Sequence, residues 1–142
     1  MLRALRNWWR TTGAMHRAYR VERAGGYLEA AELYRALEIS IEHQAHPRQS
    51  MEHAVVMQKR AQCLLRAGNV EEAGRVLLKL SANAEKDAVL AHVLAAQAED
   101  PAHLLGWLMA ELRTALAGHA LAAELASAFT GGKAPVGCKE GL

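Results

Sequence analysis

Cysteine, proline and aromatic residues are all scarce in this chain of 142 residues. Its two cysteines, Cys63 and Cys138, are too few and too far apart to indicate a disulfide framework, which favours a reducing compartment. Only three prolines and 5% aromatic residues, with few β-branched residues alternating at period two, disfavour a β-rich fold. Alanine and leucine dominate instead, and this composition predicts a single all-α domain.

Several kinds of site are also missing from the sequence. It has no run of about 18 apolar residues, so we expect no membrane-spanning helix. It has no glycine-rich phosphate loop, no cysteine-based metal cluster and no nucleophile elbow. We therefore expect a protein that is not an enzyme and that uses no cofactor.

The chain does contain one short pattern that occurs twice. Residues 23–30 and 66–73 share an Arg-Ala-Gly triplet that is followed, after a gap, by Glu-Ala. A glycine ends a helix by adopting a left-handed conformation, and acidic residues favour the first turn of the next helix. Each copy therefore predicts an antiparallel helical hairpin. Small residues seven positions before the glycines and large residues four positions after the final alanines complete the pattern, at Ala18, Ala61, Tyr34 and Leu77.

The pattern resembles the tetratricopeptide repeat (TPR). The resemblance implies an all-α fold of antiparallel hairpins, stacked as a short TPR-like right-handed superhelix of about six to seven helices. The two glycines are 43 positions apart, whereas the family repeats at about 34 residues, and the family's proline is displaced to Pro47. An ordinary helical bundle with similar hairpins is the alternative. The matching residues are Ala18, Gly25, Tyr27, Ala30 and Tyr34 in the first copy, and Ala61, Leu64, Gly68, Val70, Ala73, Leu77 and Leu80 in the second.

The periodicity divides the chain into an N-terminal segment, a helical domain and a tail. Thr11–Gly13 is expected to end the first short helix, and Ser81 and Asn83 mark a later boundary. Asp100 and Pro101 predict a helix start, because an Asp cap is followed by Pro at the first helical position. Leu104 stands where the motif has a small residue, so the third helix pair is either a diverged repeat or an unrelated hairpin. The expected parts are an amphipathic segment at 1–12, a helical domain at 13–130 with hairpins at about 14–45, 51–80 and 84–117 and a capping helix at 119–129, and a flexible tail at 131–142.

The N-terminal segment combines apolar and basic side chains on one short helix. Residues 1–24 carry six arginines and one glutamate, a net charge of +5. The apolar side chains must cover something, and three roles stay open. The segment caps the first hairpin, docks on an anionic membrane surface or a partner subunit, or targets an organelle. The residues concerned are Leu2, Arg3, Leu5, Arg6, Trp8, Trp9 and Arg10.

The resemblance also implies a concave groove lined by the first helix of each hairpin. The Lys and Asn with which some family members clamp a peptide carboxylate are absent from it. We therefore expect a cytoplasmic adaptor, scaffold or small chaperone-like module that binds a peptide or helix of another protein. We expect no nucleic acid, because the sequence shows no wider basic face. A membrane-peripheral accessory subunit, docked by residues 1–12, is the alternative. The groove positions hold Met15, Tyr19, Glu22, Arg23, Gln58, Gln62 and Arg66.

Histidines flank the loop between the first and second hairpins. A helix-loop-helix could bring His43, His46 and His53 to one metal ion, with Glu42 and Glu52 nearby. Exposed histidines near the C-terminus of a helix need no ligand, however. We therefore expect no metal site.

An enzymatic alternative comes from Arg113 and His119. An Arg followed a few residues later by a His, in a small all-helical chain, is similar to the HEPN ribonuclease family. In that family the Arg and the His act on a phosphodiester. The resemblance implies a small all-helical HEPN-like ribonuclease as an alternative function.

Overall fold

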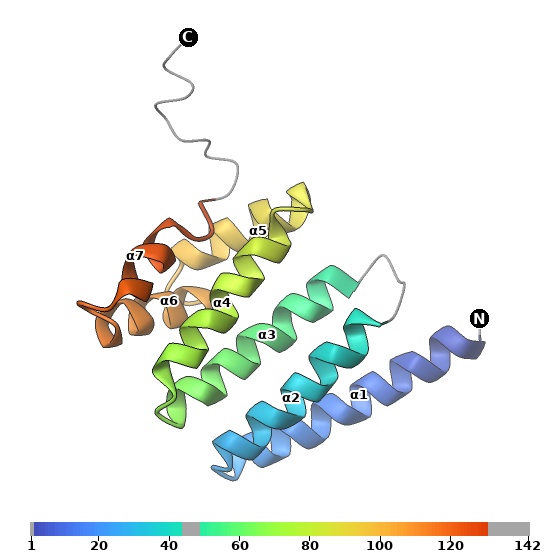
Figure 1. Cartoon of the computed structure of the whole chain (residues 1–142). Coiled ribbons are helices and arrows are strands. Elements are labelled where there is room, and N and C mark those ends of the chain that lie inside the picture. The colour runs from blue at the N-terminus through green and yellow to red at the C-terminus, as the bar shows by residue number, and fades with distance from the viewer. Residues whose placement is uncertain (1, 44–48, 131–142) are drawn as a thin grey trace. The chain divides into compact units, whose positions relative to one another are not determined.

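The computed structural model describes the backbone of residues 2–43 and 49–130, and the side chains of residues 12–43 and 51–130. Within these residues the chain forms helices and no strands (Figure 1), so the all-α class and the six to seven expected helices are confirmed. None of the helices described is both long and apolar enough to cross a membrane. The helices are α1 (Leu2–Arg23), α2 (Tyr27–Glu42), α3 (Gln49–Arg66), α4 (Val70–Ala84), α5 (Ala88–Glu99), α6 (Leu104–Ala115) and α7 (Ala120–Ser127).

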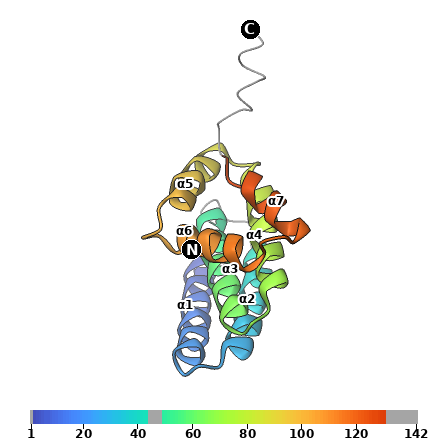
Figure 2. The same cartoon turned by 90° about the vertical axis from the view of Figure 1, so that its left-hand side faces the viewer.

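The chain divides into two compact units, Met1–Asn69 and Val70–Leu142. Unit 1 consists of α1, α2 and α3, and unit 2 consists of α4 to α7. Within unit 1, α2 packs against both α1 and α3, and the three helices run side by side in both views (Figures 1 and 2). The stacking of all hairpins as one superhelix stays a prediction.

Helices α1 and α3 both end at the glycine that the repeated pattern predicts. Gly25 and Gly68 have φ angles of 91° and 88°, a region that a residue with a Cβ atom rarely adopts. The amide of Gly26 donates to the carbonyl of Val21 at 3.0 Å, and the amide of Asn69 donates to that of Leu64 at 2.8 Å. Each bond spans five residues, as in the Schellman motif that closes helices. The two copies therefore fold alike where α1 and α3 end.

The small and large residues that complete the repeated pattern lie in the interior. All six are 0% exposed, which confirms the prediction that they are core residues. Small side chains at such places let neighbouring backbones approach closely, while the larger ones fill the space beside them. The six residues are Ala18, Ala30, Tyr34, Ala61, Ala73 and Leu77.

The helix break expected at Thr11–Gly13 is wrong, because α1 continues through it. A glycine within a helix costs only about 1 kcal/mol relative to alanine, and the neighbouring residues include good helix formers. A Cβ atom added to Gly13 would meet nothing within 4 Å, so no packing constraint bends the chain there. The predicted N-terminal segment is therefore the first half of a longer helix.

The helix start expected at Asp100 and Pro101 is also wrong. Asp100 ends α5, and α6 begins at Leu104. The Asp100 side chain accepts a hydrogen bond from the amide of Ala102 at 2.9 Å, and its carbonyl accepts one from the amide of His103 at 2.9 Å. Asp thus closes a tight turn, a role that competes with helix capping.

The boundary expected at Ser81 and Asn83 lies inside α4, which continues to Ala84. The cap that begins α5 is Asp87, whose Oδ1 accepts a hydrogen bond from the amide of Leu90 at 3.1 Å. The hydroxyl of Ser81 instead accepts a hydrogen bond from the amide of Phe129 at 3.3 Å. Serine often caps helices, but Ser81 makes a tertiary contact within unit 2 instead.

Two glycines allow close packing within unit 2. A Cβ atom on Gly106 in α6 would overlap the carbonyl group of Asp100 and lie 2.9 Å from the carbonyl oxygen of Gln97. A Cβ atom on Gly74 in α4 would lie 3.2 Å from a methyl group of Leu116 and 3.5 Å from one of Leu125. Gly106 therefore has no room for a side chain against the end of α5.

Candidate functional site

A carboxylate lies inside unit 1, at the end of α1. Glu22 is 8% exposed, and its Oε1 accepts a hydrogen bond from the Tyr34 hydroxyl at 2.9 Å. Its Oε2 accepts one from the Lys59 ammonium, also at 2.9 Å. Lys59 donates a further hydrogen bond to Oε1 of Gln62 at 2.9 Å. We call these four residues the Glu22 network; it joins α1, α2 and α3 and neutralises a charge that burial would otherwise make costly.

The surroundings of the network suppress nucleophilic chemistry. Burial raises the pKa of the Tyr34 hydroxyl, and the hydrogen bond to Glu22 raises this pKa further. Burial also raises the pKa of the Cys63 thiol to about 12, with the negative charge of Glu22 as the next cause. A thiol attacks as its thiolate, so Cys63 at neutral pH is an inert core residue.

The ring of Tyr19 lies at the surface beside the Glu22 network. It is 43% exposed, and its hydroxyl accepts a hydrogen bond from Arg23 at 3.1 Å. The guanidinium carbon of Arg23 lies 5.7 Å from the ring centroid, and the ammonium of Lys59 lies 5.5 Å from it. Both distances are within the range of cation–π attraction. One exposed aromatic ring therefore has two cations beside it.

A third cation lies over a second aromatic ring, at the start of α2. The guanidinium carbon of Arg66 is 5.9 Å from the ring centroid of Tyr27. Arg66 is exposed and Gln62, one helical turn before it on α3, is partly exposed. We name the surface formed by Tyr19, Arg23, Lys59, Gln62 and Arg66 the Tyr19 face.

The structure brings four of the seven predicted groove residues together around Lys59. They are Tyr19, Glu22, Arg23 and Gln62, while Arg66 lies over Tyr27. Glu22 and Gln58 are buried, and Met15 is partly exposed like Gln62. The groove itself stays a prediction. Sequence reasoning missed Lys59, although its position three residues before Gln62 places both on one helical face.

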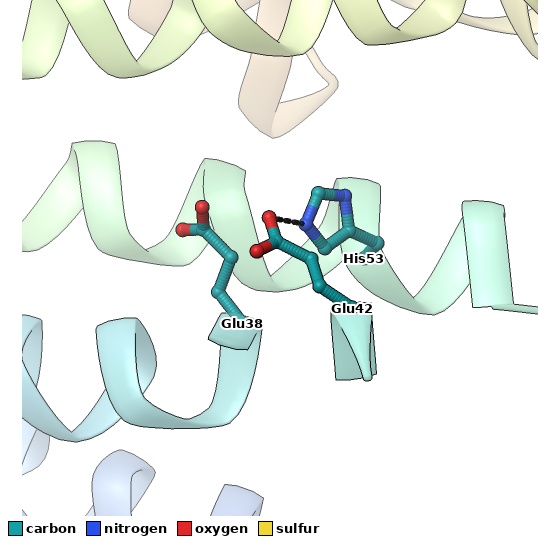
Figure 3. A group of neighbouring side chains, drawn as sticks. All are labelled: Glu38, Glu42 and His53. Carbon is teal, nitrogen blue, oxygen red and sulfur yellow. Dashed lines mark hydrogen bonds and ion pairs between the residues drawn. The ribbon is translucent and has the colours of Figure 1, made fainter. Parts of the chain in front are cut away.

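A second polar cluster joins α2 to α3. Glu38 is 1% exposed, and its Oε1 accepts a hydrogen bond from Arg60 at 3.0 Å. One turn later on α2, Oε2 of Glu42 lies 2.8 Å from Nε2 of His53 on α3. Figure 3 shows the Glu42 carboxylate between the Glu38 carboxylate and the His53 ring. Single ligand atoms of Glu38, Glu42 and His53 all lie within 4.8 Å of one another.

This cluster overlaps only in part with the histidine set singled out from the sequence. Glu42 and His53 do come together, but Glu52 is exposed and His43 lies exposed after the end of α2. His46 lies outside the described residues. Glu38 was missed, although it lies four residues before Glu42 and hence on the same face of α2.

His119 has a structural role in unit 2. Its Nδ1 accepts a hydrogen bond from the amide of Leu121 at 3.1 Å, which caps α7. Its Nε2 lies 2.6 Å from Oε1 of Glu71. Both ring nitrogens therefore have partners, and the imidazole is held in place by α4 and α7. Arg113 is an exposed residue in the last turn of α6.

The predicted docking residues lie in the first half of α1. Their backbone is helical, and their side chains lie outside the described residues. They are Leu2, Arg3, Leu5, Arg6, Trp8, Trp9 and Arg10.

The chain matches no protein-family model, no curated protein and no solved structure. The two candidate sites in the described part of the chain are the Tyr19 face and the cluster of Glu38, Glu42 and His53, both in unit 1.

Proposed function

We propose that the chain is a non-enzymatic adaptor or scaffold protein whose Tyr19 face binds an acidic segment of a partner protein. The observation that supports this most directly is the exposed ring of Tyr19 with Arg23 and Lys59 both beside it. Aromatic residues and arginine contribute most to binding energy at protein interfaces. This surface offers an apolar ring and positive charge at one place, which suits a peptide or helix with carboxylates next to an apolar residue.

The charge of α1 favours an acidic partner over a neutral one. Glu22 is the only acidic residue of α1, and it is buried in its ion pair with Lys59. Arg17, Arg20 and Arg23 are exposed on the same helix. Among the described side chains of α1, the exposed charged ones are therefore all basic. This charge would speed the encounter with an acidic segment, and salt would weaken the binding.

A random-peptide display selection on the full chain tests this proposal. We expect peptides enriched in Asp and Glu around one aromatic or aliphatic residue. The triple variant Tyr19→Ala, Gln62→Ala, Arg66→Ala should bind the selected peptides at least about tenfold more weakly, because two interface anchors of roughly 1 kcal/mol or more are removed. Its melting temperature should stay close to that of the original protein, since none of the three is buried.

The matched control carries Val89→Ala and Arg113→Ala, two exposed residues of unit 2, and should bind as tightly as the original protein. Selected peptides without acidic bias would contradict the proposal. So would equal binding by the folded triple variant, because these side chains would then only cover the surface of α1 and α3. Preferential binding of nucleic acid over acidic peptides would also overturn it.

A second function, docking on an anionic membrane, is favoured by the continuity of α1. This helix has 22 residues and α2 has 16, and the N-terminal end of α1 extends beyond α2 in Figure 1. A helix end with tryptophans and arginines suits a membrane interface. Deleting residues 1–12 should then abolish binding to anionic vesicles and leave the melting temperature unchanged. A lower melting temperature with unchanged vesicle binding would indicate a cap on the fold instead.

A further inference from the structure

We propose that Glu38, Glu42 and His53 bind one divalent transition-metal ion, Zn²⁺ first among them, at the contact between α2 and α3. This goes beyond partner binding, because the cluster does not include any residue of the Tyr19 face. Two carboxylates come from one face of α2 and an imidazole comes from α3 (Figure 3). Three protein ligands with the remaining position left to water is a common arrangement for protein-bound Zn²⁺.

The distances suit an ion shared by His53 and Glu42. Two ligand atoms that each lie about 2.1 Å from a tetrahedral Zn²⁺ are roughly 3.4 Å apart. Nε2 of His53 and Oε2 of Glu42 are 2.8 Å apart. An ion can therefore replace the proton between these two atoms when they move apart by about 0.6 Å. The third ligand atom, from Glu38, lies within 4.8 Å of both and approaches the ion by a change of side-chain torsion angles.

Arg60 contacts the site through Glu38. Its guanidinium donates a hydrogen bond to Oε1 of Glu38. A carboxylate has two oxygens and about four acceptor positions, so it can accept hydrogen bonds and ligate a metal ion at the same time. Ligating carboxylates in metal sites are commonly oriented by such hydrogen bonds. Burial also favours the ion, because the Coulomb attraction between a cation and the buried Glu38 is screened less than at the surface.

The ligand types select the class of metal. Imidazole suits zinc, copper, iron and nickel, whereas Mg²⁺ and Ca²⁺ prefer sites made of oxygen ligands alone. One nitrogen with two carboxylate oxygens therefore favours a first-row transition ion. The side chains of His53 and Glu42 are 12% and 38% exposed, so the ion has a route from solvent. The competing interpretation is a plain hydrogen-bonded pair that binds no ion.

Calorimetric titration of the metal-free full chain with Zn²⁺ separates these interpretations. We expect saturable binding of one ion per chain, and no comparable binding of Mg²⁺. The variants His53→Gln and Glu42→Gln should each weaken Zn²⁺ binding at least about tenfold, since even residues that only orient ligands contribute that much. Co²⁺ should give visible d–d absorption with the original protein, and this absorption should disappear in both variants.

The matched controls are His16→Gln and Glu32→Gln, which remove an exposed histidine and an exposed glutamate of unit 1. Both should bind Zn²⁺ like the original protein. Circular dichroism of each metal-free variant verifies that it folds. No saturable Zn²⁺ binding by the original protein would overturn the proposal. Unchanged binding by His53→Gln and Glu42→Gln would overturn it as well, because the ion would then lie elsewhere.

Discussion

Among the described residues, buried polar side chains occur only in unit 1, at Glu22, Glu38 and Gln58, whereas the buried side chains of α4 to α7 are apolar. Burying a charge costs several kcal/mol unless a partner compensates it, and well-packed apolar residues in its place are often as stable. Unit 2 obtains close packing with apolar residues and glycines. Unit 1 instead has buried charged side chains, and their pairing determines which residues of α1, α2 and α3 face one another. The two polar clusters of unit 1 are the candidate sites.

The largest expected effect comes from breaking the buried ion pair of unit 1. Glu38→Ala should lower the free energy of unfolding by about 3–5 kcal/mol, because it removes the buried carboxylate that pairs with the Arg60 guanidinium. Urea denaturation followed by circular dichroism measures this loss. The double variant Glu38→Leu, Arg60→Leu should recover most of the lost stability, since both charges are then removed. A loss below about 1 kcal/mol in Glu38→Ala would mean that solvent reaches Arg60 readily.

The closest packing of unit 2 gives the next effect. Gly106→Ala should cost about 2–3 kcal/mol, because the new methyl group would overlap the Asp100 carbonyl and force α6 away from α5. Helix propensity alone would predict a gain in stability from this change, so a loss of stability would indicate that the overlap with Asp100 dominates. Thermal denaturation of Gly106→Ala measures it, and an unchanged or raised melting temperature would show that α5 and α6 can separate freely.

Removing one hydroxyl from the Glu22 network should have a moderate effect. Tyr34→Phe keeps the buried ring but deletes the donor to Glu22, and should cost about 1.5–2 kcal/mol, as expected for a hydrogen bond to a charged group. Tyr27→Phe is the matched control and should change the free energy of unfolding little, because Tyr27 is only partly buried. Urea denaturation of both variants makes the comparison, and equal losses would contradict the role of the network.

Helix α1 of unit 1 should tolerate a Gly-to-Ala substitution, unlike α6 of unit 2. Gly13→Ala should stabilise the protein by up to about 1 kcal/mol, because alanine is the better helix former and its methyl group meets nothing within 4 Å. A raised melting temperature checks this expectation. Destabilisation would indicate that α1 is not a continuous helix at residue 13.

The smallest effect at neutral pH concerns Cys63. Its pKa is raised from 9.0 to about 12 in the folded state, so folding favours the protonated thiol. This contribution to stability is present in full below pH 9 and is lost as the pH rises toward about 12. Cys63→Ala should flatten the fall in stability over that window, measured by urea denaturation at several alkaline pH values. An unchanged pH profile would show that other groups cause the fall.

Local signals in the sequence predicted much of the fold. The glycines at 25 and 68 and the small and large residues around them marked the ends of α1 and α3 and the interior, because these features depend on backbone conformation and periodicity. The helix break at Thr11–Gly13 and the helix start at Pro101 were mispredicted, because Gly13 and Asp100 are consistent with more than one local structure. Tertiary context decides between the alternatives at such residues.

The candidate sites were harder to foresee than the fold. Tyr19, Arg23 and Gln62 were named because of the resemblance to the tetratricopeptide repeat, but the resemblance did not indicate how deeply Glu22 is buried. Lys59 and Glu38 depend on contacts between helices that are distant in sequence, at Glu22 and Arg60 respectively. Such pairs between helices can therefore be identified only from the three-dimensional structure.

The most direct test of the central claim, that unit 1 carries the partner-binding face, is a nuclear magnetic resonance titration. The ¹⁵N-labelled full chain is titrated with an acidic peptide from the display selection. We expect saturable shifts of backbone amides near Tyr19, Arg23, Gln62 and Arg66, with little change in α4 to α7. Shifts concentrated in α4 to α7, or none at all, would contradict the claim.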